Sequence, residues 1–175
     1  MATLMLVRHG ETDWNADGRL QGQTDRPLSE FGRRQARQLA DELGDDEIDA
    51  IYASDLSRAR QTAEIVGERL GLAVVLDAGL REKDWGTWEG LTSVERDRVE
   101  FVGETTEAHQ ERVLAALGRI AERHPGGRVL VVTHGGSMRR VQATALGMAL
   151  PVVENCGRWL CRCENGTFGP IMRSG

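Results

Sequence analysis

Two histidines, His9 and His134, each follow directly after a short apolar run, at residues 4–7 and 129–133. In the tripeptide Arg8-His9-Gly10, an imidazole beside a guanidinium could attack phosphorus while the arginine holds the phosphoryl oxygens. Either motif alone is weak evidence, because such short patterns also occur by chance. The repeated arrangement predicts that both histidines lie at the ends of buried strands and face one phosphoryl site.

The elements that must position these histidines alternate between short apolar runs and segments with helical periodicity. This order predicts a three-layer α/β/α fold with a mostly parallel central sheet, formed by residues 1–175 as a single domain. We expect the main strands at 4–7, 48–53, 73–76 and 129–133, with short strands near 159–163 and 168–172. We expect helices from Ser29 to Gly44, from 59 to a stop at Gly71, near 94–101, from Thr105 or Thr106 to 124, and over 137–146.

Four candidate chemical groups follow four of the predicted strands: His9, Arg58, Glu82 and His134. Ligands of open α/β sheets bind beyond the carboxyl ends of the strands, so these side chains are expected at one edge. Gly135 lies where the last helix starts, and it lets the backbone approach an anion closely. The arrangement predicts a pocket for a phosphoryl group.

Composition narrows the function classes. The formal net charge is −5, which argues against general binding of nucleic acid, because surfaces that follow phosphodiester backbones are normally basic. The apolar runs are too short to span a bilayer, and we see no signal-peptide pattern. Three cysteines fit a reduced compartment better than a disulfide framework. We therefore expect a soluble cytoplasmic protein, monomer or homodimer, whose partner is a small-molecule phosphomonoester.

Five motifs in order resemble the histidine phosphatases, the superfamily that includes the cofactor-dependent phosphoglycerate mutases. They read LVRHGETDWN at 6–15, RLQGQTDRPLSEFG at 19–32, SDLSRARQT at 54–62, LREKDWGTWEG at 80–90 and VTHGG at 132–136, and the resemblance extends over nearly the whole chain. The Gln21-Gly22 segment, the Trp-Glu-Gly at 88–90 and the glycine at 136 are similar to the phosphatase branch. Mutases usually have asparagine where Gly136 stands.

The resemblance implies a role for each matching residue. His9 would be the nucleophile that becomes a phosphohistidine, and Arg8, Arg58 and His134 would form a cationic phosphate pocket. Glu82 would be the proton donor, although Asp84 and Glu89 share its loop and remain alternatives. The residues that remain are expected to contact the substrate: Asn15, Gln21, Gly22 and Gly135. The neighbouring arginines should favour a neutral His9 ring, and we expect His134 to become a charged donor once phosphate binds. We expect no metal and no cofactor.

The leading hypothesis is a metal-independent phosphomonoesterase acting on sugar phosphates or phosphoglycerate-type acids. A phosphoglycerate mutase is the first alternative, but a mutase must cover its phosphohistidine, and residues 90–106 can supply only a small lid. A non-catalytic phosphate-binding module is the second alternative. A metal-dependent hydrolase using His9, Glu11, Asp13 and His134 is a weaker one. His109 and His124 are predicted to be surface residues.

Overall fold

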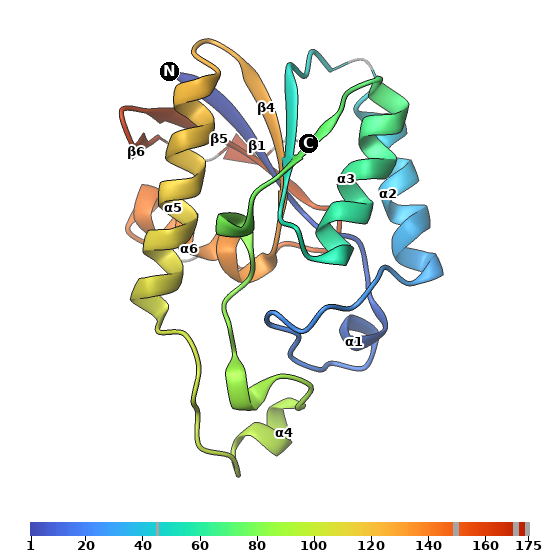
Figure 1. Cartoon of the computed structure of the whole chain (residues 1–175), viewed down its shortest axis with the longest axis vertical. Coiled ribbons are helices and arrows are strands. Elements are labelled where there is room, and N and C mark those ends of the chain that lie inside the picture. The colour runs from blue at the N-terminus through green and yellow to red at the C-terminus, as the bar shows by residue number, and fades with distance from the viewer. Residues whose placement is uncertain (45, 149–150, 170–171, 174–175) are drawn as a thin grey trace.

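The computed structural model describes residues 1–44, 46–148, 151–169 and 172–173. Its centre is a sheet with the order β3-β2-β4-β1-β5-β6, in which a further strand, β7, pairs with β5 (Figure 1). The strands are β1 (Ala2–Arg8), β2 (Ala50–Ala53), β3 (Val74–Leu76), β4 (Arg128–Thr133), β5 (Arg158–Glu164), β6 (Thr167–Phe168) and β7 (Met172–Arg173). The first four pair in parallel, and β5 joins β1 in the antiparallel sense.

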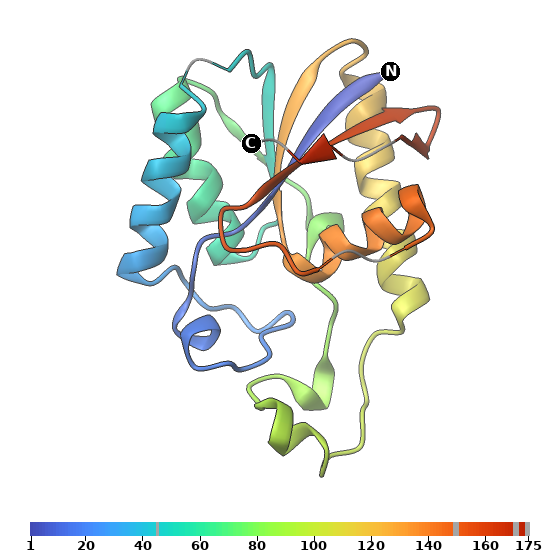
Figure 2. The same cartoon turned by 180° about the vertical axis from the view of Figure 1, so that it is seen from behind.

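Successive side chains of β1 point to opposite faces of the sheet and feed two separate cores. Leu4 and Leu6 belong to the core beneath α5 (Thr106–Arg123) and α6 (Gly135–Leu146). Met5 and Val7 belong to the core beneath α2 (Glu30–Glu42) and α3 (Ser57–Leu70). Helices therefore cover both faces of the sheet, as Figures 1 and 2 show. The predicted three-layer α/β/α fold is confirmed.

Two long connections extend beyond the carboxyl ends of the parallel strands, at the bottom of Figures 1 and 2. One leaves β1 and contains the short helix α1 (Asp13–Ala16). The other follows β3 and contains α4 (Ser93–Arg96) and two 3₁₀ helices, Ala78–Leu80 and Gly86–Trp88. These connections bring residues distant in sequence to the edge where the predicted site lies.

The helix expected near 94–101 is wrong beyond its first turn. A capping box between Thr92 and Glu95 starts α4, which ends at Arg96. The hydroxyl of Thr87 then donates to the carbonyl of Glu100 and accepts from the amide of Val102. These two bonds replace the helical hydrogen bonds and hold the segment against the 86–88 turn.

Other predicted boundaries differ slightly from the structure. The second strand starts at Ala50 rather than at 48, and α2 ends at Glu42, with Leu43 rather than Gly44 as its C-cap. Helix α6 begins at Gly135, directly after His134, rather than at 137. Cys161 and Cys163 are buried free thiols of β5, in line with the absence of a disulfide framework. None of the helices built from the described residues has both the length and the apolar character that crossing a membrane requires.

Candidate active site

His9 lies immediately after β1 and is almost completely buried. Its Nδ1 is 2.7 Å from the carbonyl oxygen of Gly10, which can only accept a hydrogen bond. The proton therefore sits on Nδ1, and Nε2 keeps its lone pair. Burial, together with the nearby guanidinium groups of Arg58 and Arg8, holds the pKa of His9 well below its ordinary value of 6.5. The ring is neutral at physiological pH.

Two arginines surround His9. Arg58 is 1% exposed on the first turn of α3, and its Nη atoms donate to the carbonyls of Gly22 and Thr24, at 2.6 and 3.1 Å. Burial lowers the pKa of Arg58 to about 10, against the opposing effect of Glu82, so the side chain stays charged at neutral pH. Arg8 donates through Nη1 to the carbonyl of Val153 at 2.7 Å. Within the described part of the chain, the buried Nε of each arginine has no hydrogen-bond partner.

The second predicted histidine meets the first. The ring centroids of His134 and His9 are 5.2 Å apart, and the Nε2 of His134 is 2.9 Å from the Oγ of Ser54. Burial and the charge of Arg58 lower the pKa of His134 well below its ordinary value, so its ring too is neutral before a ligand binds. The buried Nδ1 of His134 has no hydrogen-bond partner among the described residues. A buried polar atom without a partner is costly, so this nitrogen suits a ligand oxygen.

The polar residues predicted from the connection after β1 lie beside this group. The side-chain oxygens of Asn15 and Gln21 are both occupied by Thr12. Among the described residues, neither amide nitrogen has a partner, so both are available as donors. Gly22 has a φ of 56°, and a β-carbon there would overlap the carboxylate of Glu89. A glycine is therefore required for this turn to reach Arg58.

The three carboxylates of the 82–89 loop have different partners. Glu82 accepts from the amide of Gly136 at 2.9 Å, which places it at the start of α6, two residues beyond His134. Glu89 accepts from the amides of Gln23 and Thr24 at 2.8 Å each, so it ties two connections together. Asp84 accepts from the amide of Gly86 within its own turn. Glu82 is the carboxylate of this loop that lies at the start of α6, and its charge acts on both Arg8 and Arg58.

This geometry matches what comparison with known proteins finds. The family model described as the histidine phosphatase superfamily (branch 1) matches residues 4–164. The chain belongs to this superfamily. An uncharacterized phosphatase, PhoE, of Bacillus subtilis is 39% identical over 143 residues, which cover 79% of this chain and 74% of the relative. A probable phosphoglycerate mutase, GpmB, of Klebsiella pneumoniae is 40% identical over 164 residues, which cover 85% and 76%.

A solved structure of similar shape is a mycobacterial glucosyl-3-phosphoglycerate phosphatase in complex with VO3. It has a TM-score of 0.87 and 29% identity, covering 99% of this chain and 97% of that one. The relatives of this histidine phosphatase are thus named as phosphatases or as mutases, and both classes transfer phosphoryl groups. The superfamily supports a phosphoryl-transfer enzyme.

One prediction about the histidines is wrong. His109 is predicted at the surface but is only 2% exposed, on the face of α5 that also carries Val113 and Leu117. Its Nε2 is 3.0 Å from the Oγ of Ser137 and 3.6 Å from Oε1 of Glu82. The Ser137 hydroxyl donates to the carbonyl of Arg81, so the His109 ring is the donor in this contact. His109 therefore presents an N–H toward the Glu82 carboxylate.

His124 is also predicted at the surface. It is half-buried, and its Nε2 is 3.1 Å from the hydroxyl of Tyr52. This contact lies at the C-cap of α5, and His124 keeps part of its surface exposed, so the prediction for this residue holds in part.

Sequence reasoning also missed two residues that fix the backbone of the site. Arg112 of α5 donates to the carbonyl oxygens of Arg81 and Glu82, at 2.9 and 3.1 Å, and also binds the carboxylate of Glu104. Asn155 donates to the carbonyl oxygen of His9 at 2.9 Å. Neither contact joins residues close in the sequence, and neither residue belongs to one of the five family motifs. Their roles are visible only in the fold.

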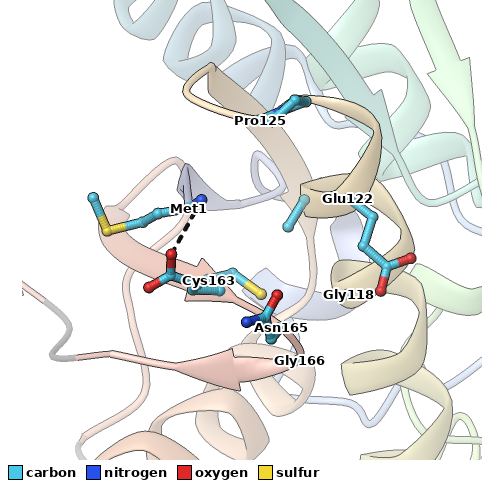
Figure 3. A pocket seen from close by; sticks show the side chains of 9 residues that line it. Met1, Gly118, Glu122, Pro125, Cys163, Asn165 and Gly166 are labelled. Carbon is cyan, nitrogen blue, oxygen red and sulfur yellow. Dashed lines mark ion pairs between the residues drawn. The ribbon is translucent and has the colours of Figure 1, made fainter.

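A separate hollow lies at the opposite edge of the sheet, near the start of β1 (Figure 3). Its lining includes Glu122, Asn165 and the Met1 amino group, which pairs with Glu164 at 3.6 Å. None of its lining residues is an arginine, lysine or histidine. The hollow thus lacks the cationic side chains that surround His9 at the carboxyl ends of the parallel strands.

Proposed function

We propose that this histidine phosphatase hydrolyses small phosphomonoesters, of the sugar phosphate or phosphoglycerate type, through a phosphohistidine on His9 and without a metal ion. The observation that carries this proposal is the hydrogen bond from Nδ1 of His9 to the carbonyl of Gly10. It fixes the ring with the Nε2 lone pair free and stops the ring from turning. A neutral, oriented imidazole is the form that can attack phosphorus.

The surrounding charges support a phosphoryl group as the electrophile. Arg8, Arg58 and His134 would hold the phosphoryl oxygens, through nitrogens that have no protein partner in the described structure. Asn15 and Gln21 would add neutral donors, and the backbone at Gly22 and Gly135 would complete the pocket. Phosphoryl transfer depends mainly on positioning and on stabilising charge at the equatorial oxygens.

The proposed reaction has two steps. Nε2 of His9 forms a bond to phosphorus while the ester P–O bond breaks, and the leaving alkoxide takes a proton from the Glu82 carboxyl group. A water molecule then loses its proton to the Glu82 carboxylate and attacks phosphorus, and the P–N bond breaks. The products are the alcohol and inorganic phosphate, and His9 and Glu82 return to their starting states.

The short connection after Glu82 favours hydrolysis over mutase activity. The amide of Glu104 donates to the carbonyl of Asp84 at 2.9 Å, so the intervening segment is a closed loop that returns to its starting point. Such a small cover leaves the phosphohistidine open to water. A mutase is the second candidate, because the similar GpmB protein is named a probable phosphoglycerate mutase.

The test is release of phosphate from a panel of small phosphomonoesters in the presence of EDTA, for the wild type and for His9→Ala. Release that is insensitive to EDTA and absent in His9→Ala supports the proposal. Activity that requires a divalent ion contradicts metal independence. Interconversion of 2- and 3-phosphoglycerate without phosphate release, after priming with 2,3-bisphosphoglycerate, identifies the mutase instead.

A further inference from the structure

A second pocket, lined in part by Glu82 and His109, lies between the 82–85 segment and helices α5 and α6. Three of its lining residues are cations: Lys83, Arg139 and Arg140. Glu82 is the one carboxylate in its lining. Its volume is about 120 Å³, enough for one small polar group. A chain with net charge −5 therefore concentrates positive charge at one small pocket beside the proposed proton donor.

Lys83 is unusual among these cations because it is 8% exposed. Its Nζ donates to the hydroxyl of Thr106 at 3.3 Å and lies 4.4 and 5.0 Å from the ring centroids of Trp85 and Phe101. No carboxylate of the described residues forms an ion pair with it. Aromatic faces and one hydroxyl hold the ammonium in place without neutralising it. A buried lysine is rarely left without an anionic partner.

The two arginines add to this excess of positive charge. Arg139 and Arg140 are half-buried in the second turn of α6, which starts directly after His134. Neither guanidinium forms an ion pair with a carboxylate in the described structure, and Nε of Arg139 is buried without a hydrogen-bond partner. Guanidinium groups bind carboxylate and phosphate through paired N–H donors. Both side chains are therefore free to bind an anion that enters the pocket.

We propose that this pocket binds a second anionic group, a carboxylate or a phosphate, carried by the leaving group of the substrate. This inference rests on the proposed function, because Glu82 must protonate the leaving oxygen and also lines the pocket. A substrate whose phosphoryl group lies at His9 would then extend past Glu82 toward Lys83. The enzyme would favour phosphorylated acids and bisphosphates over phosphate esters of neutral alcohols.

The test measures binding, so that it does not depend on turnover. In the His9→Ala variant, calorimetry gives the Kd of two ligand pairs that differ in one anionic group. The first pair is 3-phosphoglycerate and glycerol 3-phosphate, and the second is fructose 1,6-bisphosphate and fructose 6-phosphate. We expect the more anionic member of at least one pair to bind at least tenfold more tightly. The pair that discriminates identifies the group as a carboxylate or a phosphate. Equal affinities within both pairs would overturn the proposal.

Variants then locate the effect. Lys83→Met keeps the buried aliphatic part of the side chain and removes its charge. Arg140→Gln removes the charge of a side chain that is more exposed than Lys83. Each is expected to reduce the discrimination about tenfold, the scale of a charge-assisted hydrogen bond. Arg37→Gln, an exposed change on α2, is the matched control and should leave the discrimination intact. Discrimination that survives both pocket variants would contradict the assignment.

Turnover by the wild type separates the two proposals. Suppose that the wild type hydrolyses both members of each pair equally well and that both members bind the His9→Ala variant with equal affinity. The proposed phosphatase activity is then supported, and the proposed second anion site is contradicted. Suppose instead that the wild type hydrolyses no ester, that the ligand pairs still differ in affinity for His9→Ala, and that Lys83→Met abolishes this difference. The anion site is then supported, and the proposed function is contradicted.

Discussion

Glu82 and Gly136 depend on each other: the Gly136 amide donates to Oε2 of Glu82 at 2.9 Å, and a β-carbon on Gly136 would overlap the same carboxylate. Glycine at this position lets the first turn of α6 hold the proposed proton donor. The amide also offers the partial positive charge of a helix N-terminus to that carboxylate. The contact with the Glu82 carboxylate, and not the backbone conformation of Gly136, is therefore the main reason for glycine at this position.

Gly136→Ala should move Glu82 out of place and lower kcat for an alkyl phosphate by at least tenfold, with little loss of stability. The matched control is Gly118→Ala on α5, where an added β-carbon meets nothing within 4 Å. That change should raise the free energy of unfolding by up to ~1 kcal/mol, because alanine favours a helix, and should leave kcat unchanged. Steady-state kinetics and urea denaturation of both variants check this. Unchanged kcat in Gly136→Ala would contradict the role given to the contact.

Replacing Glu82 and Glu89 separately decides which carboxylate supplies the proton. Glu82→Gln should lower kcat/KM, which reports the steps up to departure of the leaving group, about 10²–10⁴-fold for an alkyl phosphate and much less for p-nitrophenyl phosphate, whose leaving group needs no proton. Glu89→Gln weakens the contacts to the amides of Gln23 and Thr24, so it should lower the rates for both substrates in the same ratio. The reverse pattern, with leaving-group dependence in Glu89→Gln, would assign the proton to Glu89.

The stability of the protein should fall as the pH drops below about 6.5. Burial lowers the pKa values of His9, His109 and His134, so the unfolded chain takes up protons in this range that the folded protein does not. Each histidine kept neutral contributes a slope of up to ~1.4 kcal/mol per pH unit, with stability present above pH 6.5 and lost below it. Urea denaturation between pH 5.5 and 7.5 measures the slope. It should be smaller in His109→Gln than in the wild type, and an equal slope would show that His109 does not contribute.

Arg58→Lys should lower kcat/KM about 10²–10³-fold, the cost of removing an oriented donor from a developing anion. A lysine keeps the positive charge but cannot donate to Gly22 and Thr24 while also facing the phosphoryl group, as the planar guanidinium does. Kinetics at several pH values separate this loss from a change in protonation. Activity close to the wild type would mean that the charge alone is sufficient.

The sequence predicts which residues meet at the carboxyl ends of the strands, because the residues that follow parallel strands all lie at the same end of the sheet. The order of strands and helices is enough to bring His9, Arg58, Glu82 and His134 together at that edge. His109 could not be placed from its polar neighbours, yet it lies four residues before Val113 on the same helical face, and this spacing indicates burial. The contacts of Arg112 and Asn155 join distant segments and have no local signal. The helix expected near 94–101 fails for the same reason, because Thr87 determines that backbone from a different turn.

The most direct test of the central claim is to trap the phosphoenzyme. The protein is mixed with a ³²P-labelled phosphomonoester, denatured within milliseconds in alkali, digested and analysed by mass spectrometry. We predict label on the peptide that contains His9, stable in alkali, lost in acid, and absent from the His9→Ala variant. Hydrolysis by the wild type with no label on His9, or with label on another residue, would contradict the account.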